Sequence, residues 1–149
     1  MSRDPEIMPE HITSGDRQAI ADLQYKFFWL IDDGRADETL SLFAPEAALT
    51  FGPNSPAPGT IEGAQLEQAM IERASQKDVS TRHVLSNLRY LRLSDGKVRL
   101  RSLLTLFRCD DGINAYTLVA DIDEIYIKLG GVWLLKSRLV SPVFKLPSD

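Results

Sequence analysis

The second half of the chain constrains the fold most, because four segments of alternating apolar and polar residues follow one another there. Short turn sequences separate these segments: "DG", then "DDG", then "GG". Asp-Gly and Gly-Gly pairs between alternating segments are typical of β-hairpins, since these residues adopt the backbone conformations that tight turns need. The sequence therefore predicts a meander of four antiparallel strands over residues 79–94, 97–110, 113–129 and 132–144.

The first half of the chain carries helical patterns instead. Apolar residues recur at helical spacing over about Arg17–Asp33, where Ser14 or Asp16 can cap the helix and Gly34 can end it. A short helix, "ADETLSLF", ends at Pro45, and a short strand "AALTFG", a loop "PNSPAPGTIEG" and a third helix "AQLEQAMIERASQ" follow. Helices placed before an antiparallel sheet predict an α+β fold, in which the helices cover one face of a curved sheet and a pocket lies between them.

The composition is that of one globular domain. The chain has 149 residues, of which 44% are hydrophobic and 26% are charged. We expect a flexible tail over residues 1–13 and a single domain over residues 14–149. No apolar run approaches the roughly 20 residues that span a bilayer, and the start, "MSRDPEIMPEHITSGD", lacks the apolar core of a secretory signal. We therefore expect a cytoplasmic protein without a membrane partner, which the single cysteine, Cys109, also fits.

The net charge of −4 argues against a nucleic-acid partner, because contacts of basic residues with phosphates dominate that affinity. One basic cluster alternates with apolar residues across the first hairpin, and we interpret it as solvated strand faces: Arg89, Arg92, Lys97, Arg99 and Arg101.

One of only two histidines, His83, lies within a predicted strand. Alternation places His83, Leu85 and Asn87 on one face of that strand, which fits the half-polar wall of a cavity. On the first helix, Asp32 shares a stripe with Phe28 at a four-residue spacing and can face inward. Each residue also has a purely structural interpretation: His83 as a satisfied core residue and Asp32 as a helix-terminal residue that caps a turn.

The chain lacks the motifs of several enzyme classes. It has no GxGxxG, no P-loop and no GxSxG sequence. Two histidines without a nearby acidic cluster predict no metal site. We therefore expect no cofactor, and any chemistry would be acid–base catalysis by side chains.

The order of "LIDDGRADETLSLFAPEAALTF", "TRHVLSNLRYLRL" and "GGVWLLKSRLVS" resembles the SnoaL-like branch of the nuclear-transport-factor-two-like superfamily over residues 14–144. This resemblance implies a cone-shaped barrel, in which a curved antiparallel sheet wraps around three amino-terminal helices. Within the superfamily, the chain is most similar to scytalone dehydratase and hexachlorocyclohexane dehydrochlorinase. The resemblance implies that His83 is a general base, that Asp32 orients it, and that Arg138 is a third member of the site.

The chain also departs from both of these enzymes. No second histidine follows His83, as one does in scytalone dehydratase, and Ile31 occupies the position of one of its tyrosines. Phe27 occupies the position of a lysine in the dehydrochlorinase. Neither substrate can therefore be carried over, whereas the His–Asp pair can.

These features predict proton abstraction from carbon, leading to a dehydratase-like elimination or to an isomerisation. Arg138 or Asn87 would stabilise the negative charge that develops. Taken from the last strand alone, Arg138 can equally be an exposed cation, because alternation does not tell which residues of that strand face inward. We expect a hydrophobic, cyclic or aromatic small molecule as substrate, in a pocket lined by Tyr25, Phe28, Trp29, Phe51, Met70, Asn87 and Tyr116.

Two other functions remain open. The first is a non-catalytic ligand-binding or assembly module, and the second is an epoxide hydrolase that uses Asp121 and Asp123. A His83–Asp32 hydrogen bond beside an accessible pocket would favour the enzyme. We also expect a homo-oligomer, a trimer rather than a dimer, because the strands offer more apolar surface than one pocket needs: Val98, Leu100, Leu104, Leu106, Val119 and Ile125.

Overall fold

A computed structural model describes residues 12–147 of the chain, so most of the predicted tail lies outside the described residues. Three helices and six strands follow one another in the order α1 (Ser14–Asp32), η2 (Ala36–Leu42), β1 (Phe43–Phe51), β2 (Gly59–Glu62), α2 (Gly63–Ser75), β3 (Ser80–Arg92), β4 (Val98–Cys109), β5 (Ala115–Leu129) and β6 (Val132–Pro142). The short helix η2 is a 3-10 helix. None of the helices in this part of the chain is both long and apolar enough to cross a membrane.

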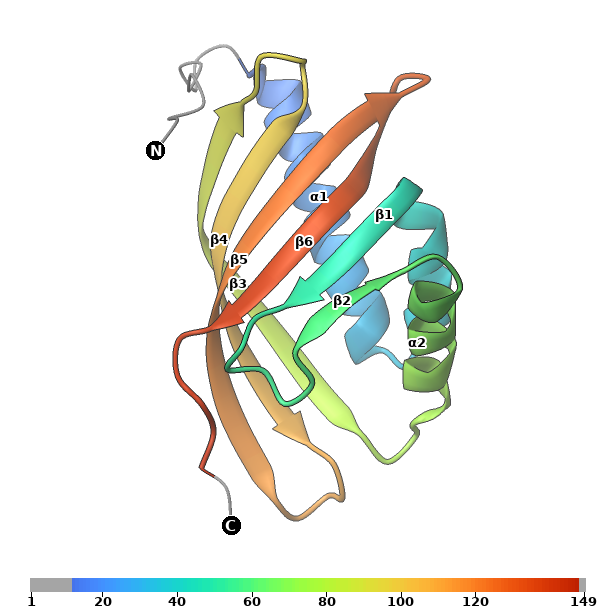
Figure 1. The fold of residues 1–149 in the computed structure, drawn as a ribbon, viewed down its shortest axis with the longest axis vertical. Helices are drawn as coiled ribbons and strands as arrows, with labels where there is room; N and C mark the ends of the chain where they lie inside the picture. Colours follow the sequence, from blue (N-terminus) through green and yellow to red (C-terminus); the bar gives the residue numbers. More distant parts are fainter. Residues whose placement is uncertain (1–11, 148–149) are drawn as a thin grey trace.

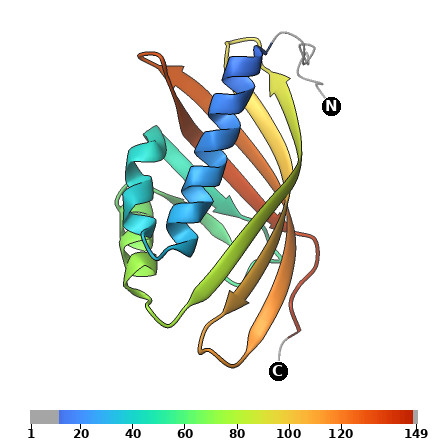
Figure 2. The ribbon, with the colours of Figure 1, turned by 180° about the vertical axis from the view of Figure 1, so that it is seen from behind.

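The strands form one curved, unclosed sheet in the order β2-β1-β6-β5-β4-β3. The predicted meander is confirmed, since β3, β4, β5 and β6 pair with one another in antiparallel fashion. The sheet as a whole is mixed rather than antiparallel, because β1 pairs with β6 in parallel. Helix α1 lies across the concave face, and η2 and α2 lie beside it, as Figures 1 and 2 show.

Three local expectations in the first half were wrong. Thr13 caps α1, because its side chain accepts a hydrogen bond of 3.0 Å from the backbone N–H of Asp16. Pro45 lies within β1, where a register shift and a positive φ of 58° at Glu46 accommodate it. The Pro- and Gly-rich segment predicted as a loop contains β2, which pairs with β1 at the edge of the sheet.

The main core lies between α1 and the concave face of the sheet. Ile20 and Phe27 of α1 are buried against Leu100, Tyr126 and Leu135 from three different strands. Since apolar burial is the dominant favourable contribution to folding, this layer fixes where α1 lies on the sheet. A smaller cluster lies farther along the sheet: Leu104, Leu118, Ala120 and Ile122.

Two bulges change which side chains face inward. In β3, the register against β4 shifts between Ser86 and Arg89, and Asn87 has a φ of 58°. Asn87 is therefore exposed, and the expectation that it shares a face with His83 was wrong. In β6, the register against β5 shifts around Lys136, so that Leu135 and Arg138 both face inward although they are three residues apart.

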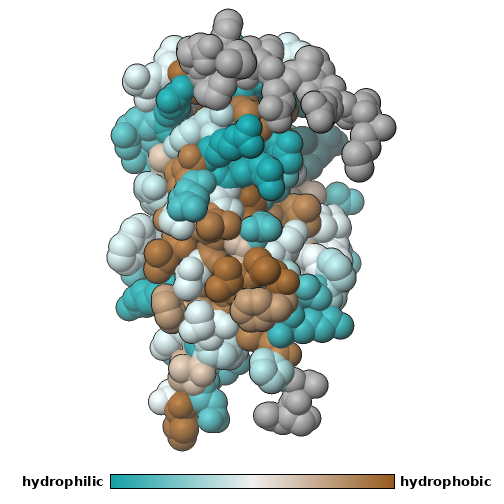
Figure 3. Space-filling model, turned by 90° about the vertical axis from the view of Figure 1, so that its left-hand side faces the viewer, coloured by the Kyte–Doolittle hydropathy of each residue, from teal (hydrophilic) through white to brown (hydrophobic). Residues whose placement is uncertain are grey.

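The outer face of the sheet carries exposed apolar side chains. Val84, Phe107 and Leu139 are 50%, 48% and 39% exposed. Figure 3, which views the molecule from the side at the left of Figure 1, shows an apolar patch at mid-height. Three of the residues expected to provide apolar surface for an oligomer interface instead point inward and are buried in the core: Val98, Leu100 and Leu104.

The bulge at Asn87 gives a test of the fold. Its left-handed backbone suits Asn or Gly and disfavours a β-branched residue, which pays a steric cost there. We expect Asn87→Gly to leave the free energy of unfolding within about 0.5 kcal/mol of the wild type and Asn87→Val to lower it by about 1–2 kcal/mol. Urea unfolding monitored by circular dichroism measures both. Equal stability of the two variants would contradict the bulge.

Candidate active site

The two predicted catalytic residues, His83 and Asp32, are hydrogen-bonded to each other. His83 Nδ1 lies 2.6 Å from Asp32 Oδ1. The backbone N–H of His83 donates to Oδ2 over 3.0 Å, and the Thr81 hydroxyl donates to Oδ1 over 2.8 Å. Only 10% of the His83 side chain and 5% of the Asp32 side chain are exposed. The end of α1 and the start of β3 are joined at this point.

Asp32 is held as an ionised carboxylate. Burial by itself would raise the pKa of the Asp32 carboxyl, but the hydrogen bonds from His83 and Thr81, with the charge attraction of His83, lower it below its ordinary value. A carboxylate at Nδ1 fixes the tautomer with hydrogen on Nδ1, so that Nε2 carries the lone pair. The Phe28 ring stacks on the imidazole at 4.7 Å between centroids and further restrains it.

His83 lines a cavity of about 350 Å³ between α1 and the sheet. Most of its walls are apolar. The side chains that line it are Phe27, Phe28, Ile31, Leu49, Phe51, Ser55, Pro56, Ala57, Met70, Arg73, Thr81, His83, Leu104, Leu106, Arg108, Leu118, Arg138, Val140 and Pro142. A neutral imidazole in an apolar cavity is suited to accept a proton from a bound molecule.

Arg138 also lines this cavity and is only 3% exposed, so the interpretation of it as an exposed cation was wrong. Its Nε donates to Glu124 Oε2 over 2.8 Å, and Glu124 is fully buried. The guanidinium lies 4.1 Å and 4.5 Å from the ring centroids of Phe27 and Phe28, which is cation–π geometry. The bulge around Lys136 causes this inward placement.

A second nitrogen of Arg138 faces the same carboxylate. Nη2 lies 2.7 Å from Glu124 Oε2 but makes no well-oriented hydrogen bond to any described residue. Glu124 is occupied by other donors, since Tyr126 and Gln24 also donate to its two oxygens. Arg138 is therefore a buried, ion-paired cation at the cavity, and a cation there suits an oxygen that becomes negative during a reaction.

The structure brings only some of the predicted lining residues to the cavity. Phe28, Phe51 and Met70 line it. Tyr25 and Trp29 lie on the solvent side of α1 and are 40% and 61% exposed, respectively. The stripe of α1 side chains that faces the sheet is therefore narrower than expected. Asn87 is turned outward by the bulge, and the half-buried Tyr116 lies outside the cavity lining.

Sequence reasoning missed Thr81, Glu124, Arg73 and Arg108. Thr81 lies two residues before His83 on the same strand, so alternation could have found it. Arg73 lies three residues after Met70 on α2, a spacing that puts both on one side of the helix. Glu124 and Arg108 carried no signal, because a charged residue within a strand pattern ordinarily faces solvent.

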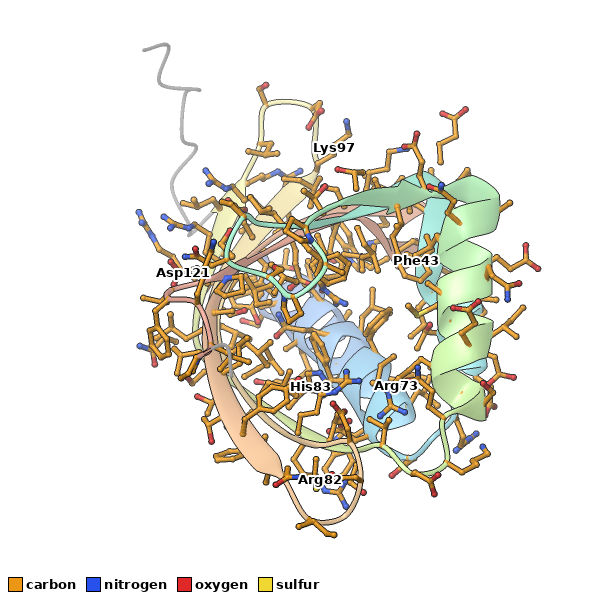
Figure 4. The ribbon with its side chains drawn as sticks, turned by 60° about the horizontal axis from the view of Figure 1, so that its bottom comes forward. Phe43, Arg73, Arg82, His83, Lys97 and Asp121 are labelled. Atoms are coloured by element: carbon orange, nitrogen blue, oxygen red, sulfur yellow. The ribbon has the colours of Figure 1, made fainter. Side chains whose placement is uncertain are left out.

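Other candidates lie away from the cavity. Asp123 is ion-paired with Arg99 on the outer face of the sheet, and Figure 4 shows Asp121 outside the cavity, so neither acid of the epoxide hydrolase hypothesis lines it. Cys109, at the end of β4, has its sulfur 3.9 Å from Asp111 Oδ1 and does not line the cavity. Within residues 12–147, no three of the His, Cys, Asp and Glu side chains are grouped so as to hold a metal ion.

Comparisons with known proteins identify the family of this chain. The family model of the SnoaL-like domain matches residues 13–139, which is most of the chain. The chain belongs to the SnoaL-like family. No curated protein matches the sequence at a significant level. The matched residues include Asp32, His83 and Arg138, so the whole candidate site of this SnoaL-like protein lies within the family domain.

Solved structures share the fold. A protein of unknown function with a cystatin-like fold from Nostoc punctiforme is 24% identical, with a TM-score of 0.73, and the match covers 91% of this chain and 97% of that one. A protein provisionally assigned as a scytalone dehydratase from Novosphingobium aromaticivorans is 17% identical, with a TM-score of 0.76 and coverages of 91% and 89%. A provisionally assigned aromatic ring hydroxylase from the same organism is 15% identical, with a TM-score of 0.79 and coverages of 92% and 95%.

The buried ion pair gives a test of the site's architecture. Glu124→Leu leaves Arg138 buried without its counter-charge, and we expect this variant to lose about 3–5 kcal/mol of stability. The double variant Glu124→Leu/Arg138→Met removes both charges and should recover most of that loss. Urea unfolding of the two variants and of Arg138→Met closes the cycle. A loss below about 1 kcal/mol in Glu124→Leu would show that Glu124 does not neutralise Arg138.

Proposed function

We propose that this protein is a cofactor-independent enzyme that removes a proton from carbon, with His83 as general base and Asp32 as the group that orients it. The observation that carries the proposal is the 2.6 Å contact between His83 Nδ1 and Asp32 Oδ1, because the His83 side chain also lines the cavity. This contact directs the Nδ1 proton toward the carboxylate, so that the basic lone pair is on Nε2.

In the first step, Nε2 of His83 takes a proton from a carbon beside a carbonyl, and the electron pair of the broken C–H bond delocalises onto the carbonyl oxygen. The imidazolium that forms is stabilised by the carboxylate of Asp32. The negative oxygen is stabilised by the positive charge of Arg138, which lines the same cavity.

The second step determines the reaction class. In an elimination, the electron pair returns from oxygen, the C=C bond forms, and a hydroxyl on the neighbouring carbon leaves as water with the proton held by His83. In an isomerisation, His83 returns that proton to a different carbon. The same base serves both outcomes, and the similarity to a provisionally assigned scytalone dehydratase supports the elimination.

The cavity supports a hydrophobic, cyclic or aromatic substrate. Its volume of about 350 Å³ falls at the lower end of the range for small-molecule sites, and apolar side chains such as Phe51, Met70 and Leu106 form its walls. Apolar walls exclude water and so strengthen each of the few polar interactions inside.

We expect His83→Ala and Asp32→Asn to lower kcat/KM by about 10²–10⁴-fold on a panel of hydroxylated ring substrates, because both variants remove the oriented base. Loss of water is followed by the absorbance of the new double bond, and exchange of the abstracted proton with deuterium from solvent is followed by NMR. Asp33→Asn is the matched control, since it makes the same substitution at the neighbouring exposed carboxylate and should leave the rate unchanged.

Full activity of both variants would refute the dyad mechanism. Ligand binding by the wild type without turnover or deuterium exchange on any of the panel would instead support the alternative, a non-catalytic binding module of the same fold.

We further propose that the protein is a homotrimer. The support is the exposed apolar outer face of the sheet, which contrasts with the concave face that α1 covers. Phe107→Glu should shift the trimer toward monomer in sedimentation velocity, because it places a charge on that apolar face. Ile113→Glu is the control, since Ile113 is exposed in the turn between β4 and β5. A monomeric wild type would contradict this proposal.

A further inference from the structure

Two cations at the cavity have no part in the proposed reaction. Arg73 comes from α2 and Arg108 from the inner face of β4, and both line the same cavity as His83. The described lining includes no Asp or Glu side chain. The third cation of the lining, Arg138, is already neutralised by Glu124. The charged side chains that α2 and β4 bring to the cavity lining are therefore both cationic.

Arg73 is held in place beside the base. Its Nη2 donates to the Thr81 hydroxyl over 3.0 Å, and that hydroxyl donates in turn to Asp32. Figure 4 shows Arg73 and His83 directed toward the same space beside the carboxyl end of α1. A guanidinium has five N–H donors, of which the bond to Thr81 uses one.

Arg108 is held by an ion pair with an acidic residue. Its Nε donates to Asp110 Oδ1 over 2.6 Å, and Asp110 is exposed at the end of the strand. That bond engages Nε and leaves the Nη donors of a side chain that lines the cavity.

Arg73 and Arg108 line one cavity, and their like charges repel each other. Burial lowers the pKa of Arg73, repulsion by Arg108 lowers it further, and the attractions of Asp32 and Asp110 act in the opposite direction but are each weaker. An anion between the two arginines would relieve this repulsion.

We propose that Arg73 and Arg108 form a subsite for a carboxylate group of the substrate. Arginine donors are arranged to bind a carboxylate through paired, charge-assisted hydrogen bonds. The apolar walls would hold the ring of the same molecule. The ligand class is thus an aromatic or cyclic carboxylic acid, rather than a neutral phenol or a sugar. The proposal rests on the proposed function only in taking this ligand to be the substrate, because the subsite itself can be measured without turnover.

The test is a comparison of two probes of the same shape, 2-naphthoate and 2-naphthamide, bound to the full chain and measured by titration calorimetry. We expect the wild type to bind 2-naphthoate at least tenfold more tightly than the amide. The preference should fall as NaCl is raised, because salt screens the attraction.

Variants assign the preference to the two arginines. Arg108→Gln and Arg73→Gln should each lower the preference about tenfold and leave binding of the amide unchanged, which also shows that the cavity is intact. Arg101→Gln is the matched control, since it removes one positive charge from the exposed outer face of β4. His83→Ala should keep the preference, so that loss of catalysis and loss of the subsite are separate results.

Equal affinity of the wild type for the two probes would overturn the proposal, as would a lack of measurable 2-naphthoate binding. A preference that Arg73→Gln and Arg108→Gln both leave unchanged would also overturn it. None of these results depends on whether His83 is catalytic.

Discussion

The hydrogen bonds that Asp32 accepts are the interaction on which the site depends. A carboxylate at the carboxyl end of a helix is unfavourable with respect to the helix dipole, and burying it adds a desolvation cost. Three donors from the first residues of β3 offset that cost: the Thr81 hydroxyl, the His83 backbone and the His83 ring. The same three bonds join α1 to β3, which is an edge strand of the sheet. Helix placement and histidine orientation therefore have one cause.

The sequence predicted the meander and the His83–Asp32 pair, and it could not predict which residues of β3 and β6 face inward. Turn pairs such as Gly130-Gly131 have a local physical cause and are visible in the sequence. A bulge adds one residue and reverses the facing of every residue beyond it, without changing the alternating pattern on either side. For this reason the alternating pattern places Asn87 in the cavity wrongly. It also does not determine whether the Arg138 side chain points inward, because the bulge around Lys136 decides that.

The arrangement of buried charges favours His83, rather than an acid, as the proposed base. The two oxygens of Asp32 accept hydrogen bonds from three donors. The oxygens of Glu124 accept hydrogen bonds from Arg138, Tyr126 and Gln24. A carboxylate that is fully hydrogen-bonded holds its charge but has little remaining basicity. The Nε2 lone pair of His83 has no such set of donors in the described residues. Proton transfer is thereby directed to one nitrogen.

Phe28 contacts both the proposed base, His83, and the cation proposed to stabilise the negative charge, Arg138. Its ring stacks on the His83 imidazole at 4.7 Å and lies 4.5 Å from the Arg138 guanidinium. A rigid ring in contact with both groups sets the separation between base and cation, because neither can move toward the other without displacing it. In the proposed reaction, that separation has to match the distance in the substrate between the carbon that loses the proton and the oxygen that becomes negative. The aromatic residue that the sequence suggested as part of the wall thus also acts as a spacer, and in the proposed reaction its size would restrict which carbon of a substrate ring His83 can reach.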